Sequence, residues 1–166
     1  VAPKIVQANT QAILMVASGQ AVVDGVRAFR AAGSAAQIVT LSNNASGGFI
    51  KSLGSDARGV IVTQVFPSER SIAYPMVKEA QELLKAKKQG GELSPAMLEG
   101  YAAAKVLVEA LRRAGPKPTR EKIQMALEGI RKFDLGGLEL SFSPEHHTGL
   151  DFADLSIIGS DGKFMR

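Results

Sequence analysis

The feature that most constrains the fold is a short apolar segment followed at once by an amphipathic one. Residues 11–18 (QAILMVAS) are apolar without the period of a helix, which is typical of a strand buried on both faces. Residues 20–32 have the period of a helix with one apolar face, and Gly33 supplies its stop. Ser18 and Gly19 form a tight turn between the two. A strand joined to a helix in this way is the building block of an α/β sheet.

The same alternation continues along the chain before helices take over. Further strands are predicted at residues 37–41 and 59–66, with a short helix at residues 49–53 between them. Near the C-terminus, residues 138–142 and 152–158 alternate as strands do. The predicted fold is therefore a doubly wound, mainly parallel α/β sheet flanked by helices, with right-handed crossovers.

Three helices are predicted between the third and fourth strands. They run from Ile72 to about Lys88 with Gly90–Gly91 as the stop, from Ser94–Pro95 to Ala114, and over residues 120–129. Ser94–Pro95 is a strong start signal, because serine caps a helix and proline suits its first turn. The middle helix has apolar residues at three- and four-residue spacing, namely Met97, Tyr101, Ala104, Val108 and Leu111.

Composition excludes several classes of site. The chain has 166 residues, of which 45% are hydrophobic, enough for one domain with a core. It has no cysteine, which excludes disulfides, thiolate metal sites and cysteine nucleophiles. The net charge of +4 comes from clusters at residues 85–88, 112–120 and 131–132, all at predicted helix C-termini, where cations are favoured. Without aromatic residues among them, these clusters indicate solvated helix ends, so no nucleic-acid partner is predicted.

No constellation for catalysis is visible in the sequence. His146 and His147 are the two histidines, and as neighbours in a polar loop they point apart, which disfavours a shared metal ion. Gly47–Gly48 matches no phosphate-binding loop, and Ser18 lacks the glycine two residues earlier that a nucleophile elbow requires. The sequence therefore predicts a protein that is not an enzyme and that needs no metal or cofactor.

Two polar turns follow predicted strands, and ligands of open α/β sheets bind beyond the carboxyl ends of their strands. Ser18–Gly19 lies between a strand and a helix N-terminus, where free N–H groups favour a carboxylate or another acceptor. Ser18 is also what a simple helix cap looks like. The second turn, residues 42–44 (SNN), suits a polar ligand or a local turn held by asparagine side chains.

Four stretches of the sequence, in their order and spacing, resemble one protein family. They are AILMVASGQAVVDGVRAFRAAG, QIVTLSNNASGGFIKSLGSDARGVIVTQVFP, EGYAAAKVLVEALRRAG and LGGLELSFSPEHHTGLDFADLSIIGSDGKF. Each is similar to a segment of the type I periplasmic solute-binding proteins that serve ABC importers of branched-chain amino acids and related molecules. The likeness covers nearly the whole chain.

The resemblance implies a function and a place in the cell. Members of the family bind a small molecule between two lobes that close about a hinge, and they present it to a membrane permease. An amino acid, a small carboxylate or an amide is the implied ligand. The implied location is the periplasm, with a signal peptide expected in an N-terminal part that residues 1–12 (VAPKIVQANTQA) do not supply.

The resemblance also implies ligand-binding residues. The family contact after the first strand falls on Ser18 and Gly19, and the contact after the second falls on Ser42 with Asn43 beside it. Phe66, where a strand meets the hinge, and Tyr101, on the crossing helix, are expected to line the cleft. Amino-acid-binding relatives have an acid at the position of Ser42, where it pairs with the α-ammonium group. A neutral serine cannot do so, which puts an α-amino acid in doubt.

By the same resemblance, residues 1–166 are the C-terminal portion of a two-lobed protein. Residues 1–92 and 150–166 are assigned to the second lobe, and residues 93–149 to a segment that crosses to the first. The partner implied first is the missing N-terminal lobe, without which apolar surface on the helix at residues 94–114 would favour rearranged packing or self-association. The alternative function is the ligand-sensing domain of a regulator or receptor with the same lobe fold.

Overall fold

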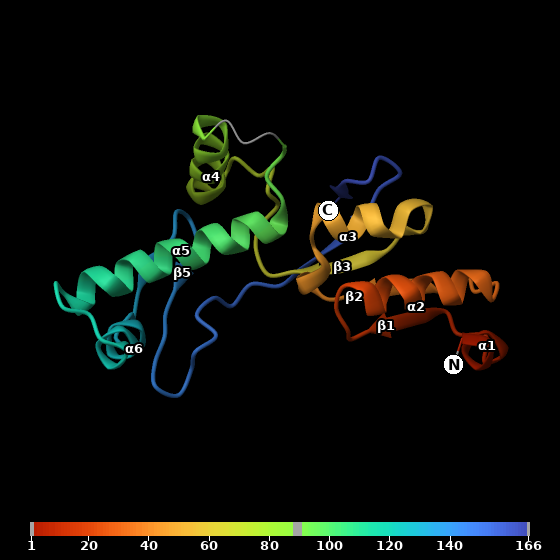
Figure 1. Cartoon of the computed structure of the whole chain (residues 1–166), viewed down its shortest axis with the longest axis horizontal. Helices are drawn as coiled ribbons and strands as arrows, with labels where there is room; N and C mark the ends of the chain where they lie inside the picture. The colour runs from red at the N-terminus through yellow and green to blue at the C-terminus, as the bar shows by residue number, and fades with distance from the viewer. Residues whose placement is uncertain (1, 88–90, 166) are drawn as a thin grey trace. The chain divides into compact units, whose positions relative to one another are not determined.

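The computed structural model describes residues 2–87 and 91–165, and these form two compact units (Figure 1). The first unit contains the chain up to Val65 together with the chain from Ala153 onward, and the second runs from Phe66 to Phe152. The sequence placed the first division at residues 92/93. The compact units of this chain divide at 65/66, because helix α4 (Pro75–Ala86) packs its Met76 and Val77 into the core of the second unit, and the assignment of lobes in the intact protein stays a prediction.

The first unit is built on a five-stranded sheet with the order β1-β2-β3-β6-β7. Strands β1 (Ala12–Met15), β2 (Gln37–Thr40) and β3 (Ile61–Gln64) are parallel, and β6 (Asp154–Ile158) and β7 (Phe164–Met165) continue the sheet in antiparallel pairing. This confirms the predicted α/β fold class with a mainly parallel sheet. The two-residue strand β7 was not predicted.

Helices α2 (Gln20–Ala31) and α3 (Gly47–Leu53) pack on one face of this sheet. Their apolar residues share a core with Ile13, Ile38 and Val62. Helix α1 (Ala2–Gln7) contacts α2, and the short 3₁₀ helices η1 (Ser42–Asn44) and η2 (Gly54–Ala57) flank α3.

On the other face of the sheet, apolar residues of β1, β6 and β7 are exposed. Leu14 on β1 is 63% exposed, and the cross-strand pair Ile157 and Met165 on β6 and β7 is also exposed. The prediction that the first strand is buried on both faces is therefore wrong for this chain. Its alternation of buried and exposed residues is that of a strand covered by helices on one side only.

The second unit is mostly helical. It contains α4, α5 (Pro95–Ala114), α6 (Arg120–Glu128) and the two-stranded sheet of β4 (Phe133–Asp134) and β5 (Glu139–Leu140). Ser94 accepts a hydrogen bond from the Met97 N–H at 3.3 Å, as its sequence signal predicted. No described helix of either unit is long and apolar enough to span a membrane.

Two details of these helices differ from the sequence predictions. Helix α4 begins at Pro75, so Ile72 lies before it and is 72% exposed; the predicted end at Lys88 and Gly90 falls outside the described residues. In α5 the core contacts are made by Leu98 and Ala102 rather than by Met97 and Val108.

Candidate functional site

Parallel pairing brings the carboxyl ends of β1, β2 and β3 to one edge of the first unit. The turn with Ser18 and Gly19 follows β1, and the η1 turn with Ser42 and Asn43 follows β2. Ligands of open α/β sheets bind at this kind of edge. The structure thus brings the four predicted residues of the first unit to the same end of the sheet.

Asn44 holds this edge together. Its side chain is 2% exposed; its Oδ1 accepts the Gly19 N–H at 2.8 Å, and its Nδ2 donates to the Ala17 carbonyl and to Thr40 Oγ1, both at 3.0 Å. Because this amide is buried and all these hydrogen bonds are formed, it fixes the turn after β1 against the end of β2. Sequence reasoning chose Ser42 and Asn43 of the SNN turn as ligand contacts and gave Asn44 no role, because only burial distinguishes Asn44 from its neighbour.

The turn after β1 differs from a serine-capped helix start. Gly19, at φ 54°, is the N-cap residue of α2, and no side chain caps that helix. The reading of Ser18 as a cap is therefore wrong. Ser18 is exposed, and its hydroxyl makes no hydrogen bond within the described part of the chain. The Gly19 N–H is engaged by Asn44, which leaves the backbone N–H groups of Gln20 and Ala21 as the open donors of the first turn.

The turn after β2 offers one more open hydroxyl. The Ser42 N–H donates to Thr63 Oγ1 at 2.9 Å, which ties η1 to β3. The Ser42 side chain is half-buried, and its hydroxyl oxygen, Oγ, makes no hydrogen bond among the described residues. Asn43 is exposed, with Oδ1 accepting from Asn44 Nδ2 at 3.1 Å. The edge as a whole presents neutral donors and no charged side chain from these turns.

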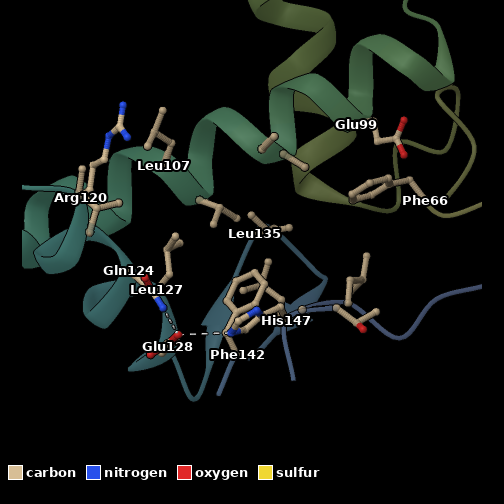
Figure 2. A pocket seen from close by; sticks show the side chains of 18 residues that line it. Phe66, Glu99, Leu107, Arg120, Gln124, Leu127, Glu128, Leu135, Phe142 and His147 are labelled. Atoms are coloured by element: carbon tan, nitrogen blue, oxygen red, sulfur yellow. Dashed lines mark hydrogen bonds and ion pairs between the residues drawn. The ribbon is translucent and has the colours of Figure 1, made fainter. Parts of the chain in front are cut away.

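Phe66 lies in the second unit, on the wall of an apolar groove of about 770 Å³. Figure 2 shows Gln124, Glu128 and His147 pointing toward one another at one side of this groove. Glu128 Oε1 accepts from Gln124 Nε2 at 2.9 Å and lies 3.3 Å from His147 Nε2. The remaining walls are formed mainly by aliphatic and aromatic side chains of α5, α6 and the segment after β5.

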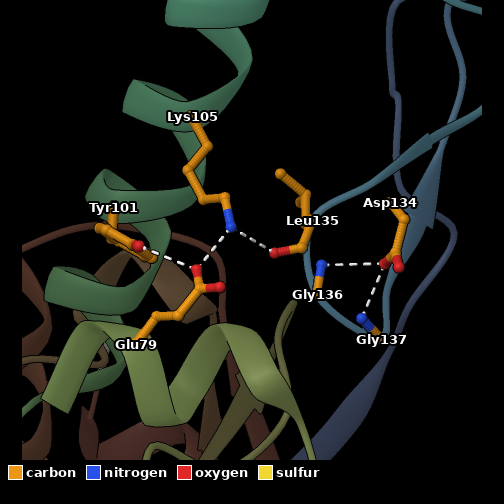
Figure 3. Close-up of polar contacts among 7 residues, drawn as sticks. All are labelled: Glu79, Tyr101, Lys105, Asp134, Leu135, Gly136 and Gly137. Carbon is orange, nitrogen blue, oxygen red and sulfur yellow. Dashed lines mark hydrogen bonds and ion pairs between the residues drawn. The ribbon is translucent and has the colours of Figure 1, made fainter. Parts of the chain in front are cut away.

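Tyr101 does not line the same groove as Phe66. It borders a smaller hollow of about 300 Å³ on α5 and takes part in the polar cluster of Figure 3. Its hydroxyl donates to Glu79 Oε2 at 3.1 Å, and the Lys105 ammonium donates to the same oxygen at 2.6 Å. The pKa of Tyr101 is raised, mainly because the hydroxyl is partly buried and secondly because of its hydrogen bond to Glu79. The Tyr101 hydroxyl therefore already donates its hydrogen bond to a residue of the second unit.

Lys105 connects that cluster to the turn between β4 and β5. Its ammonium also donates to the Leu135 carbonyl at 2.8 Å. On the same turn, Asp134 Oδ1 accepts the N–H groups of Gly136 and Gly137 at 2.8 and 2.7 Å, and these bonds lower the pKa of Asp134. The cluster therefore braces α4, α5 and the turn together.

Comparison with known proteins identifies the family. Residues 1–155 match the family described as periplasmic binding protein, which is most of the chain. The chain belongs to this family.

Solved structures of binding proteins share the fold. A possible leucine/isoleucine/valine-binding protein from Rhodopirellula baltica SH 1 is 28% identical with a TM-score of 0.85, over 96% of this chain and 44% of that one. A substrate-binding periplasmic protein from Ralstonia solanacearum is 33% identical with a TM-score of 0.82, over 98% and 49%. A putative branched-chain amino acid ABC transporter protein from Rhodospirillum rubrum is 26% identical with a TM-score of 0.65, over 97% and 45%. No curated protein gave a match.

This binding-protein chain spans about half the length of those solved relatives. Within that half, the predicted ligand residues are distributed over both units: four at the sheet edge of the first, and Phe66 and Tyr101 at separate hollows of the second. Their role in binding stays a prediction.

Proposed function

We propose that this chain is the C-terminal half of a periplasmic solute receptor, and that the sheet edge of its first unit forms one jaw of the ligand cleft. Membership of the periplasmic binding protein family supports a ligand-binding role outside the cytoplasm. The observation that carries the site is the edge itself, where Asn44 fixes two turns and leaves the hydroxyls of Ser18 and Ser42 open.

The chemistry of this edge bears on the ligand. Hydroxyl and backbone donors suit a carboxylate or amide oxygen, and the helix dipole of α2 adds partial positive charge there. No carboxylate lies in the two turns to pair with an ammonium group. We therefore propose a small carboxylate or amide as ligand, or an amino acid whose ammonium group is bound by another part of the receptor.

The receptor's partners follow from the same proposal. Relatives about twice as long, together with the exposed apolar sheet face, support an N-terminal lobe that completes the cleft. The proteins similar to this chain include one whose title names a branched-chain amino acid ABC transporter, which supports the permease of an ABC importer as the membrane partner. Closure of the two lobes about a hinge would present the ligand to it.

Thermal-shift measurements on the intact gene product test the site. Amino acids, aromatic acids and amides are screened first, and a ligand at a hundred times its dissociation constant is expected to stabilise the protein by about 2.7 kcal/mol. Ser18→Ala and Ser42→Ala should each weaken binding by about tenfold, because each removes one hydrogen bond to the ligand, without lowering the melting temperature of the free protein.

Ser52→Ala is the matched control, because Ser52 is an exposed serine on α3 that belongs to neither turn. The Ser52→Ala variant should bind the ligand with the affinity of the wild type. If Ser18→Ala and Ser42→Ala both bind as the wild type does, the edge is not the ligand site.

A further inference from the structure

Gln64, the last residue of β3, carries a buried donor without a partner. The residue is 2% exposed, and its Nε2 atom makes no hydrogen bond to any described residue. Nearly all buried polar groups in folded proteins are paired, because an unpaired donor loses its bonds to water and gains nothing in return. An orphaned donor at a strand end therefore calls for a reason.

The register of the sheet places Gln64 at the proposed ligand edge. Thr40 pairs with Val62, so Gln64 lies on the same face as Thr40 and two residues nearer the carboxyl end. Asn44 reaches that face as well, since its Nδ2 donates to Thr40 Oγ1. The same residue accepts the Gly19 N–H and so holds the start of α2. Ser42, at the start of η1, donates its N–H to Oγ1 of Thr63, the residue before Gln64, so the end of β3, η1 and the start of α2 lie at one edge.

Asn44 and Thr40 have their hydrogen bonds made within the protein, whereas Gln64 Nε2 does not. The Asn44 amide uses both of its atoms, and Thr40 Oγ1 donates to the Met15 carbonyl at 3.1 Å and accepts from Asn44. Gln64 Nε2 is therefore an unpaired donor among the described residues. It lies at the same edge as the open hydroxyls of Ser18 and Ser42, which can also donate.

We propose that Gln64 is a ligand-contacting residue whose amide N–H donates to an acceptor oxygen of the bound molecule, a carboxylate or a carbonyl. This inference rests on the proposed function and deepens it. An N–H donor cannot bind an ammonium group, so this contact of Gln64 Nε2 falls on an acceptor group of the ligand. Because the amide is already out of water, it loses no hydration when the ligand arrives.

Gln37 provides a contrast on the neighbouring strand. It lies at the opposite, amino end of β2, and its Nε2 donates to the carbonyls of Ile38 at 3.0 Å and Gly59 at 2.6 Å. The two glutamines share a sheet and a residue type but differ in whether the donor is paired. Substituting each by methionine, which has nearly the same shape, isolates that difference.

The first arm of the test measures stability without ligand. Gln64→Met should raise the melting temperature of the chain, because it replaces an unpaired buried donor by an apolar group. Gln37→Met should lower it, because it removes two hydrogen bonds. A lower melting temperature for Gln64→Met would overturn the proposal, since it would show that the amide has a structural partner such as a buried water molecule.

The second arm measures binding to the intact gene product by calorimetry, with L-leucine, 4-methylpentanoate and 3-methylbutylamine as probes. The carboxylate probes should bind and the amine should not. Gln64→Met should weaken the binding of the carboxylates by about tenfold, while Gln37→Met should leave it unchanged. Equal affinities of Gln64→Met and wild type for a carboxylate would overturn the proposal for Gln64 but leave the receptor function intact. A wild-type protein that binds none of the probes would count against both.

Discussion

At the scale of single residues, the sheet edge depends on one asparagine. Asn44 and Asn43 are neighbours with the same side chain, yet the first is buried in a network and the second is exposed. Sequence reasoning reached the SNN turn from its position after a strand. It named Asn43 as a ligand contact and missed the buried role of Asn44, because burial is decided by how β1 and the start of α2 pack beside the turn.

This difference predicts unequal losses of stability. Asn44→Ala should lower the free energy of unfolding by about 1–3 kcal/mol, because it leaves buried partners such as Thr40 Oγ1 and the Ala17 carbonyl with fewer bonds. Asn43→Ala, the matched control, should change it by less than about 0.5 kcal/mol, as exposed substitutions usually do. Urea denaturation of both variants measures the difference, and equal losses would show that Asn44 does not hold the edge.

At the scale of elements, local signals predicted most helices and strands but not their exposed faces. The Ser94–Pro95 start of α5 is where the sequence placed it. The two-residue strands β4 and β7 were missed because so short a segment has no period. The apolar spacing in α5 indicated a helix, yet it could not decide that Leu98 rather than Met97 faces the core, since both positions belong to apolar rows.

The brace formed by Lys105 gives the second unit a pH dependence. The pKa of Glu79 lies below its ordinary value of 4.5, chiefly because Lys105 donates to the carboxylate. A lowered carboxyl pKa adds stability that is present above the ordinary value and is lost as the pH falls through the folded one. Lys105→Met should therefore lower the stability by about 1 kcal/mol at neutral pH, and by less in acid below the pKa of Glu79.

Lys78→Met is the control for this effect. Lys78, on α4, is likewise a lysine beside a glutamate, but its Nζ lies 4.0 Å from Glu82 Oε1 and both side chains are well exposed. Its substitution should change little at either pH. Urea midpoints measured at neutral and acidic pH compare the two variants. A loss from Lys105→Met that is as large in acid as at neutral pH would show that the carboxylate of Glu79 is not involved.

At the scale of the whole molecule, the main feature is the division of the chain into two compact units. The sequence resemblance predicted a chain that covers half of a receptor, and the length of the solved relatives agrees with that share. The compact units divide between Val65 and Phe66, beside the position that the resemblance gave to the hinge, whereas the assigned lobe boundary at residues 92/93 stays a prediction. The apolar pattern of β1 could not reveal its exposed side, since a strand covered on both faces has the same composition.

The exposed sheet face predicts how the isolated chain behaves in solution. Leu14 and Leu155 are more than half exposed on the face that α2 and α3 leave open, and such surface tends to mark an interface. The chain should therefore self-associate as its concentration rises, and it should bind a hydrophobic dye. Replacing both leucines by lysine should shift light scattering toward the monomer. Met125→Lys, which adds a charge at an equally exposed position on α6, should not. A chain that stays monomeric at all concentrations and binds no dye would show that this face needs no cover.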